Sequence, residues 1–317
     1  MTLRTDTNGG LARRDLRRPG WGKTLRNDWE LYLLLLPPML FALLFKYGSY
    51  AGLVVAFKDY KILKGFFASK WVGFAQFEKV FATRDFARAV RNTLLLNGLD
   101  LILGFPAPIM LALLLNEVRG RAFKRVTQTL LYLPHFLSWV IIGAIAYQLF
   151  SLSGIVNTVI TNAGGAAVPF LQENNHWLAS YLMIGVWQNM GWGTIVYLAA
   201  ITGVNPELYE AALTDGATRL RRMWHVTLPG IRPTIVTLLI MNLGRVMGGS
   251  FERVYALMNV ATTEYTYTIP VLVYRWGLES GRYSQATALG LFQSVIGLLL
   301  VLGSDFAAKR FGEEGLL

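Results

Sequence analysis

Residues 210–229, which read EAALTDGATRLRRMWHVTLP, form a charged stretch between two long apolar segments. Asn205 and Pro206 precede it and are typical of the N-cap and the first position of a helix, so a short helix is predicted to begin there. Gly216 can supply the turn that follows. Apolar residues at helical spacing then favour a second helix at a membrane interface. These residues are Leu220, Met223, Trp224 and Leu228. A polar connection of this kind indicates contact with a partner.

The composition of the chain is that of a membrane protein. Hydrophobic residues make up 54% of the 317 residues, charged residues only 15%, and the mean hydropathy is +0.41. A soluble domain would need more polar residues to cover its surface. The sequence therefore predicts an all-α integral membrane protein that is surrounded by lipid.

Six apolar stretches are long enough to cross a bilayer, whose hydrocarbon core of roughly 30 Å requires about 20 residues per helix. The stretches are residues 31–57, 90–115, 126–150, 177–201, 233–258 and 284–308. The first exceeds one span and contains Pro37 and Pro38, so it is expected to kink, or to end early and continue at the interface. The chain thus divides into a basic tail (1–30), a six-helix membrane domain (31–308) and a short C-terminal tail (309–317).

Basic residues predict the orientation of these helices. The N-terminal tail carries seven Lys/Arg and has no small-residue cleavage site after a short apolar core, so it is expected to be retained rather than removed as a signal peptide. With both termini in the cytoplasm, the cytoplasmic segments hold 17 Lys/Arg and the external loops hold nine. This contrast fits the positive-inside rule, although the first external loop, residues 58–89, alone carries seven.

Catalytic, metal and nucleotide sites are not expected in this chain. It has no cysteine, and its three histidines lie in separate segments without ligand spacing. The Gly22-Lys23-Thr24 sequence resembles the end of a phosphate-binding loop, but Arg17 stands where that loop requires glycine. The basic tail lacks the interleaved aromatic residues of a nucleic-acid site. We therefore predict a protein that is not an enzyme, holds no cofactor or metal and binds no nucleic acid.

The spacing within the charged stretch resembles that of a known family. Glu210-Ala211-Ala212, then Gly216 after three residues, then the VTLP of residues 226–229 after nine more, is similar to the EAA loop of permease subunits from binding-protein-dependent ABC importers. Valine stands where isoleucine is usual, which preserves shape. The loop would lie on the predicted cytoplasmic side between two spans, as in that family.

Further motifs over residues 30–310 resemble the carbohydrate-importing branch of the family. They are FKDY at 57–60, WVGF at 71–74, YLPHFLSW at 132–139 and GWGTIVYLAA at 191–200. The YSQATA of residues 283–288, followed by GLFQS at 290–294, is similar to the oligosaccharide and polysaccharide subgroup, in which alginate-importer permeases are one member.

The resemblance implies a fold, a location and a set of partners. The fold would be the six-helix permease of type I ABC importers, in the bacterial inner membrane. The partners would be membrane lipid, a second and different permease, two ATPase subunits that bind ATP and Mg, a periplasmic solute-binding protein and a carbohydrate. Residues 202–232 would couple ATP hydrolysis to alternating access. The residues that would contact the ATPase are Glu210, Ala211, Ala212, Asp215 and Gly216.

Helical phase supplies candidate residues for the translocation pathway. Asp100 lies on a polar face of the second predicted span, and Asn242 and Arg245 share a face of the fifth with Gly249 and Glu252. A buried arginine is costly in a membrane, so Arg245 is expected to face a cavity or a carboxylate, with Asp100 and Glu252 as candidate partners. A cavity-lining Arg245 would favour acidic oligosaccharides over neutral ones.

The fourth predicted span offers a second set of candidates. Gln188 and Trp192 share one face, which Asn189 borders. An aromatic plane with nearby amides suits a sugar, but Trp192 could equally pack against a helix. The polar groups of all these spans could likewise serve only to pair helices. Small residues on the last span, Gly290, Ser294 and Gly297, predict close helix packing.

Two other classes of protein compete with the importer interpretation. An ion-coupled secondary sugar transporter would also have six or more spans with buried charges, but it would not need a loop that contacts an ATPase. An integral membrane enzyme would need converging acid, base or metal groups, and the sequence contains no such set.

Overall fold

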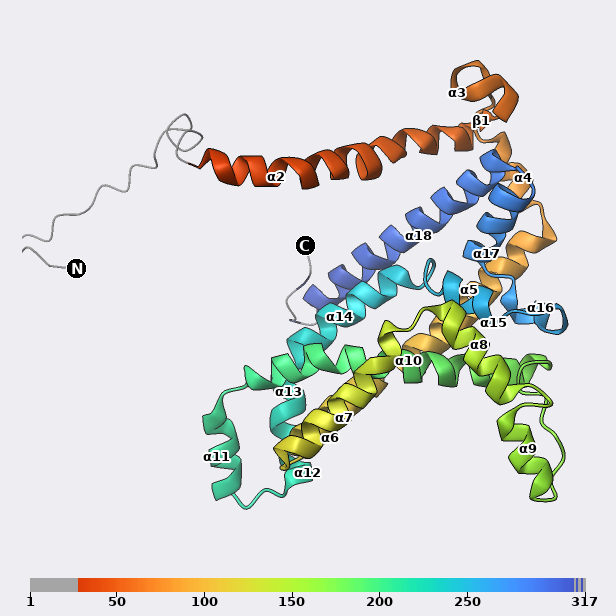
Figure 1. Cartoon of the computed structure of the whole chain (residues 1–317). Coiled ribbons are helices and arrows are strands. Elements are labelled where there is room, and N and C mark those ends of the chain that lie inside the picture. Colours follow the sequence, from red (N-terminus) through yellow and green to blue (C-terminus); the bar gives the residue numbers. More distant parts are fainter. Residues whose placement is uncertain (1–27, 311, 313–314, 316–317) are drawn as a thin grey trace, which may run out of the picture. The chain divides into compact units, whose positions relative to one another are not determined.

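The computed structural model describes residues 28–310, 312 and 315, which are almost entirely helical (Figure 1). The chain divides into two compact units, residues 1–54 and 55–317. Nearly all of the predicted basic tail, and most of the predicted C-terminal tail beyond Arg310, lie outside the described residues.

The described part of the first unit is one long apolar helix, which ends at Phe57, just past the boundary of the unit. It is α-helical over Trp29–Phe41 (α2), π-helical over Ala42–Tyr47 (η1) and 3-10 helical from Gly48 (η2, Gly48–Phe57). Pro37 and Pro38 lie inside α2 and remove two backbone donors. The helix nevertheless continues over all 29 residues, so the expected early end is wrong.

The second unit is built around long helices with short elements between them. The long helices are α5 (Arg84–Gly104), α6 (Pro106–Glu117), α7 (Arg121–Tyr132), α8 (Trp139–Phe150), α10 (Asn174–Thr202), α14 (Arg232–Arg245) and α18 (Tyr283–Arg310). The short helices are η3 (Ile62–Lys64), α3 (Gly65–Ala68), α4 (Ala75–Phe81), η4 (Leu133–Phe136), α9 (Ile155–Asn162), α11 (Pro206–Thr214), α12 (Arg219–Arg222), η5 (Met223–Thr227), α13 (Leu228–Gly230), α15 (Phe251–Leu257), η6 (Val260–Thr262), α16 (Thr263–Thr266), α17 (Ile269–Tyr274) and η7 (Arg275–Glu279). Strands β1 (Lys58–Asp59) and β2 (Lys70–Trp71) form one antiparallel pair.

Several of these helices are apolar enough and long enough to cross a membrane. Among the described residues, four qualify outright, and a fifth qualifies if Arg219–Gly230 and Arg232–Arg245, bent by 61°, form one span. The four are Trp29–Phe57, Arg84–Glu117, Trp139–Asn162 and Tyr283–Arg310. The fourth predicted span corresponds to α10, which has 29 residues but is not in that set. Six spans therefore stay a prediction.

The third predicted span is not one helix. Residues 126–150 are interrupted between α7 and α8, where Leu133–Phe136 forms a 3-10 turn. Pro134 lies in this turn and cannot continue an α-helical ladder. Ser138 then caps α8, since its hydroxyl accepts a hydrogen bond from the Ile141 N–H. The prediction of an uninterrupted helix over 126–150 was wrong.

The fifth predicted span is also broken. α14 ends at Arg245 and α15 begins at Phe251. Gly248 and Gly249 weaken a helix here, and Ser250 has a left-handed backbone with φ of 67°. The Ser250 hydroxyl donates a 3.0 Å hydrogen bond to Asn97 Oδ1 of α5, which favours the break.

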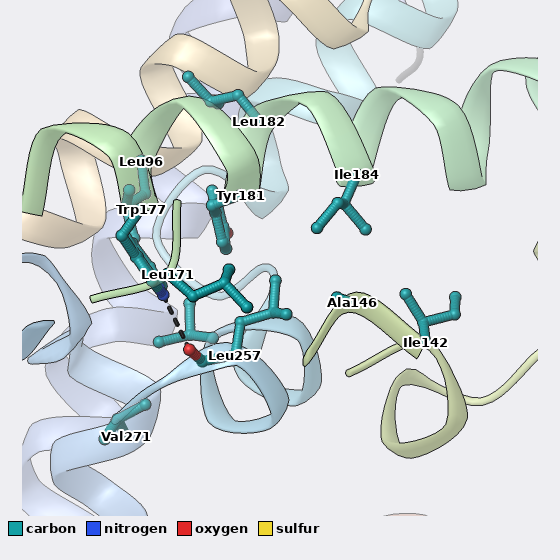
Figure 2. Close-up of a cluster of buried hydrophobic side chains, with 11 residues drawn as sticks. Leu96, Ile142, Ala146, Leu171, Trp177, Tyr181, Leu182, Ile184, Leu257 and Val271 are labelled. Atoms are coloured by element: carbon teal, nitrogen blue, oxygen red, sulfur yellow. Dashed lines mark hydrogen bonds between the residues drawn. The ribbon is translucent and has the colours of Figure 1, made fainter. Parts of the chain in front are cut away.

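Buried aromatic and aliphatic side chains hold α10 against its neighbours (Figure 2). Trp177 and Tyr181 of α10 are fully buried, and their rings stack with centroids 5.0 Å apart. The Trp177 Nε1 donates a 2.8 Å hydrogen bond to the carbonyl of Leu257 at the end of α15. α10 thus forms a common support for α5, α8 and α15.

Glycines permit two close helix contacts. A Cβ at Gly191 of α10 would lie 1.9 Å from the Leu131 carbonyl oxygen of α7. A Cβ at Gly297 of α18 would lie 3.1 Å from the Gly244 carbonyl oxygen of α14, and α14 and α18 run side by side (Figure 1). The close packing predicted for the last span is confirmed at Gly297, whereas Gly290 has open space around it.

Replacing Gly191 by alanine should destabilise the protein by about 1–3 kcal/mol, because the new Cβ would collide with a backbone carbonyl that a side-chain rotation cannot move. Gly98→Ala is the matched control, since no atom lies within 4 Å of its Cβ position. The midpoint of thermal unfolding in detergent measures both. Equal midpoints for the two variants would contradict the close contact.

Candidate coupling loop and translocation pathway

The start of the predicted coupling loop is a capped helix. The Asn205 side-chain oxygen accepts a 3.1 Å hydrogen bond from the Glu207 N–H, and Pro206 is the first residue of α11. The predicted helix start is therefore confirmed. No residue of α11 is buried, and Glu210, Ala211 and Asp215 are exposed while Ala212 is half-buried. The exposed surface of α11 is therefore available to a partner.

Gly216 ends α11 in a conformation that favours glycine. Its φ is +73°, in the left-handed region. The Gly216 N–H bonds to the Leu213 carbonyl and the Ala217 N–H bonds to the Ala212 carbonyl, which is the Schellman pattern of a helix C-terminus. No atom lies within 4 Å of a Cβ placed here, so the backbone angle and not the space requires glycine.

The loop is anchored to the helices behind it. The Tyr209 hydroxyl of α11 donates a 3.0 Å hydrogen bond to Thr227 Oγ1 of η5. Tyr209, Met223 and Leu228 pack on a cluster of buried residues that includes Tyr197 of α10. Of the predicted apolar stripe after Gly216, Met223 and Leu228 thus pack against this cluster, whereas Leu220 and Trp224 are exposed.

Arg245 lies exposed at the end of α14, beside a hollow of about 490 Å³. α18 supplies Gln293 and Ser294 to the same hollow. None of its lining residues is a carboxylate. Because α14 ends at Arg245, Glu252 does not continue its helical face, and that part of the prediction was wrong. Asn242 does not line the hollow, and its side-chain amide donates to the Leu238 carbonyl within α14.

Asp100 pairs with Arg253 of α15 instead of Arg245. Arg253 is only 3% exposed, and its guanidinium carbon lies 3.9 Å from the centre of the Tyr181 ring. Gly185 of α10 allows this approach, because a Cβ there would overlap the guanidinium. The pair ties α5, α10 and α15 together.

Sequence reasoning missed Arg253. An arginine within an apolar segment is by itself a signal of a paired or functional group, and Arg253 could have been weighed on that ground. On the same face of α5 as Asp100, Asn97 accepts from Ser250 and Thr93 Oγ1 accepts from the Ile269 N–H. The alternative in which these polar groups pair helices thus describes this face of α5.

Gln188, Asn189 and Trp192 of α10 occupy different environments. Gln188 is buried, and the Asn189 amide donates to the Gly185 carbonyl. Trp192 is 44% exposed and stacks on the His135 ring at 4.8 Å with an angle of 4° between the planes. The Phe136 ring packs against the same indole in a T-shaped arrangement, with centroids 5.6 Å apart. The structure therefore groups Trp192 with the turn after α7, and Trp192 does not line the hollow beside Arg245.

These features define a class of protein, a helical membrane transport permease. Residues 104–312 match the family described as "Binding-protein-dependent transport system inner membrane component", and the chain belongs to that family. The matched range contains α11, Gly216 and Arg245. Membership of the family predicted from the charged stretch is confirmed.

Curated relatives and solved structures specify the branch. The chain is 46% identical to protein LplB of Bacillus subtilis (strain 168) over 93% of each chain. It is 45% identical to the polygalacturonan/rhamnogalacturonan transport system permease protein YteP of the same organism, over 90% of this chain and 89% of YteP. These similarities confirm the carbohydrate branch.

Two solved structures have the same fold. A chain of a bacterial alginate ABC transporter, crystallised in complex with an alginate pentasaccharide-bound periplasmic protein, matches with a TM-score of 0.84 and 39% identity over 93% of this chain and 99% of that chain. A chain from a bacterial ABC transporter involved in the import of the acidic polysaccharide alginate matches with a TM-score of 0.83 and 40% identity, covering 91% and 98%. The chain therefore has the type I ABC permease fold and is an inner membrane component of a sugar ABC transporter.

Replacing Asp100 by asparagine should destabilise the protein by about 3–5 kcal/mol, because it leaves the Arg253 charge buried and unpaired. The double variant Asp100→Leu with Arg253→Met removes both charges and should recover most of that loss. The free energy of unfolding in detergent measures the difference. The control is Asp59→Asn, in an exposed pair with Lys61 at 4.0 Å, which should cost less than about 1 kcal/mol. A double variant as unstable as Asp100→Asn would show that the unpaired Arg253 charge is not the cause of the instability.

Proposed function

We propose that this chain is one of two different permease subunits of an ATP-driven importer of acidic oligosaccharides or polysaccharides such as alginate. A periplasmic binding protein delivers the saccharide, six helices cross the membrane, and both termini lie in the cytoplasm. The observation that carries the proposal is the match to a chain of an alginate transporter, with a TM-score of 0.84 and 39% identity over 93% of this chain.

Arg245 supports an acidic substrate. Arg245 lines a hollow that has no carboxylate among its lining residues, with Gln293 and Ser294 contributed by α18. A guanidinium binds a carboxylate through charge-assisted hydrogen bonds that a neutral sugar hydroxyl cannot match. The amide and hydroxyl groups on α18 are suited to the remaining sugar hydroxyls. Arg245 would therefore discriminate uronic acids from neutral sugars.

The other pathway residues have distinct proposed roles. The half-exposed Trp192 ring, held by its stack on His135, offers a flat surface to the C–H groups of a sugar, with Gln188, Asn189 and Asn242 as hydrogen-bonding groups near the path. Asp100 acts indirectly, since its ion pair with Arg253 holds α15 in place.

Residues 202–232 are the proposed coupling loop. Glu210, Ala211, Ala212 and Asp215 form the surface that enters a cleft of an ATPase subunit, and two such subunits hold the ATP and Mg. The hydrogen bond of Tyr209 to Thr227 connects α11 to η5, which leads through α13 into α14. Movement of α11 would therefore reach Arg245 at the far end of α14.

Replacing Arg245 by glutamine should weaken stimulation of the ATPase by a binding protein loaded with uronic-acid oligosaccharides. The concentration of loaded binding protein that gives half-maximal ATPase stimulation should rise about tenfold or more, because a hydrogen bond to a charged group contributes about 1.5–3 kcal/mol. The assay uses the complete transporter reconstituted in proteoliposomes, with neutral oligosaccharides as the comparison. Arg245→Lys is the control that retains the charge. Equal stimulation of the wild-type transporter by acidic and neutral substrates would contradict an acidic substrate.

Replacing Gly216 by valine should uncouple ATP hydrolysis from transport. A left-handed backbone costs an L-residue roughly 1–2 kcal/mol, and more when the residue is β-branched. Gly216→Asn is the control, since asparagine tolerates this conformation and the surrounding space is open. The measurement is the ratio of saccharide transported to ATP hydrolysed. A valine variant with the wild-type ratio would show that the turn is not required.

A further inference from the structure

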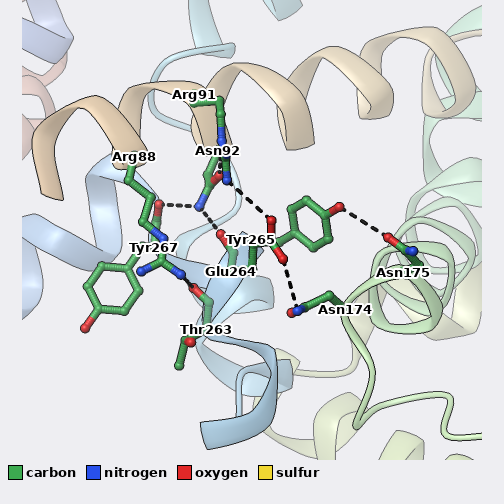
Figure 3. A network of polar contacts seen from close by, with 9 residues as sticks. All are labelled: Arg88, Arg91, Asn92, Asn174, Asn175, Thr263, Glu264, Tyr265 and Tyr267. Atoms are coloured by element: carbon green, nitrogen blue, oxygen red, sulfur yellow. Dashed lines mark hydrogen bonds and ion pairs between the residues drawn. The ribbon is translucent and has the colours of Figure 1, made fainter. Parts of the chain in front are cut away.

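A polar cluster away from the Arg245 hollow joins three segments that are far apart in sequence (Figure 3). α5, the start of α10 and residues 263–267 each contribute side chains. All three segments lie at or next to loops that the charge distribution predicts to be external. The side chains used below are Arg88, Arg91, Asn92, Asn174, Glu264 and Tyr267.

Arg88 and Arg91 line an open hollow of about 580 Å³ together with Ala87 and Glu264. The two arginines are three residues apart on α5, so they are neighbours on one helix face. A volume of several hundred Å³ is the size of a small-molecule site. Because only these four residues line the open hollow, a sugar ring would contact it from one side.

Neutral groups hold the Arg88 guanidinium in position, and a neutral amide together with the Glu264 carboxylate holds that of Arg91. The Arg88 Nη2 donates a 2.7 Å hydrogen bond to the Thr263 carbonyl, and its guanidinium carbon lies 4.9 Å from the centre of the Tyr267 ring. The Arg91 Nε donates to Asn92 Oδ1 at 3.2 Å. Asn92 is itself fully buried, and its amide donates to the carbonyls of Glu264 and Tyr267. The hollow is thus preformed by contacts of α5 with residues 263–267.

Positive charge exceeds negative charge around this hollow. Glu264 is its sole lining carboxylate; it lies 4.0 Å from Arg91 and also accepts a hydrogen bond from Asn174. Within the described residues, no carboxylate is within ion-pairing distance of Arg88. Arg275 contacts the same Tyr267 ring, with its guanidinium carbon 4.8 Å from the ring centre, but does not line the hollow. Fixed guanidinium groups with unused donors are suited to a carboxylate ligand.

We propose that this hollow binds a carboxylate of an acidic saccharide at the external end of α5, before the saccharide reaches Arg245. Arg88 and Arg91 take the carboxylate, and Glu264 accepts from sugar hydroxyls. The combination of two cations with one hydrogen-bond acceptor fits a hydroxylated anion better than an inorganic one. The proposal rests on the proposed function, because the acidic saccharide and the external side both come from it.

The test measures direct binding of trigalacturonate to the complete transporter in nanodiscs, without the binding protein. All variants carry Arg245→Gln, so that the other hollow does not contribute. The added variants are Arg88→Gln with Arg91→Gln, Arg91→Gln alone, and Arg84→Gln as the control. Arg84 is exposed on the same helix and does not line the hollow. Titration calorimetry gives the dissociation constants, and size-exclusion elution checks the fold.

The double replacement should raise the dissociation constant at least tenfold, Arg91→Gln should raise it less, and Arg84→Gln should leave it unchanged. Methyl-esterified trigalacturonate should bind at least tenfold more weakly than the acid. Because the Arg91 side chain is exposed, the Arg91→Gln variant is expected to fold and tests the site even if the double variant does not fold.

Equal binding of the acid and its methyl ester would overturn the proposal. Unchanged trigalacturonate binding in Arg91→Gln and in the double variant would also overturn it. If both variants then bound the empty binding protein more weakly, the surface would be a protein contact. Substrate preference in transport is a separate measurement. An importer of neutral saccharides that still bound trigalacturonate through Arg88 and Arg91 would refute the proposed function and not this site.

Discussion

The arrangement of the second unit depends on the need to neutralise one buried charge. Arg253 is almost completely buried among apolar helices, where an unpaired guanidinium would cost several kcal/mol. Asp100 of α5 supplies the counterion, and the Tyr181 ring of α10 lies against the guanidinium. Gly185 provides the space. α15 is therefore fixed to α5 and α10, and the chain that leads into it must accommodate that position.

This constraint explains why α14 is a separate helix. At one end, α14 meets the segment Arg219–Gly230 at an angle of 61°. At the other end, residues 246–250 break the helix before the fixed α15, and Ser250 is bound to Asn97 in a left-handed conformation. α14 thus lies between a segment proposed to move and a segment held by an ion pair. Its close contact along α18, through Gly244 and Gly297, keeps it packed between these ends.

Local signals made part of this structure predictable from sequence. Asn205, Pro206 and Gly216 act through their own backbone and side-chain preferences, so the start and end of α11 followed from residue type alone. The breaks at Leu133–Phe136 and at residues 246–250 lie in apolar segments that hydropathy joins into one span. The Asp100–Arg253 pair joins residues 153 positions apart, and no periodicity within one helix can indicate such a partner. The two helix breaks and the ion pair depend on tertiary contacts, and helix propensity alone does not predict them.

The length of α14 sets the scale of any motion that it transmits. It contains 14 residues, and a helix of that length is about 21 Å long. A rotation of about 10° around one end would therefore displace the other end by roughly 4 Å, which exceeds the reach of a hydrogen bond. α14 is therefore long enough to turn a modest change of angle at one end into a displacement at the other end that is sufficient to break a hydrogen bond.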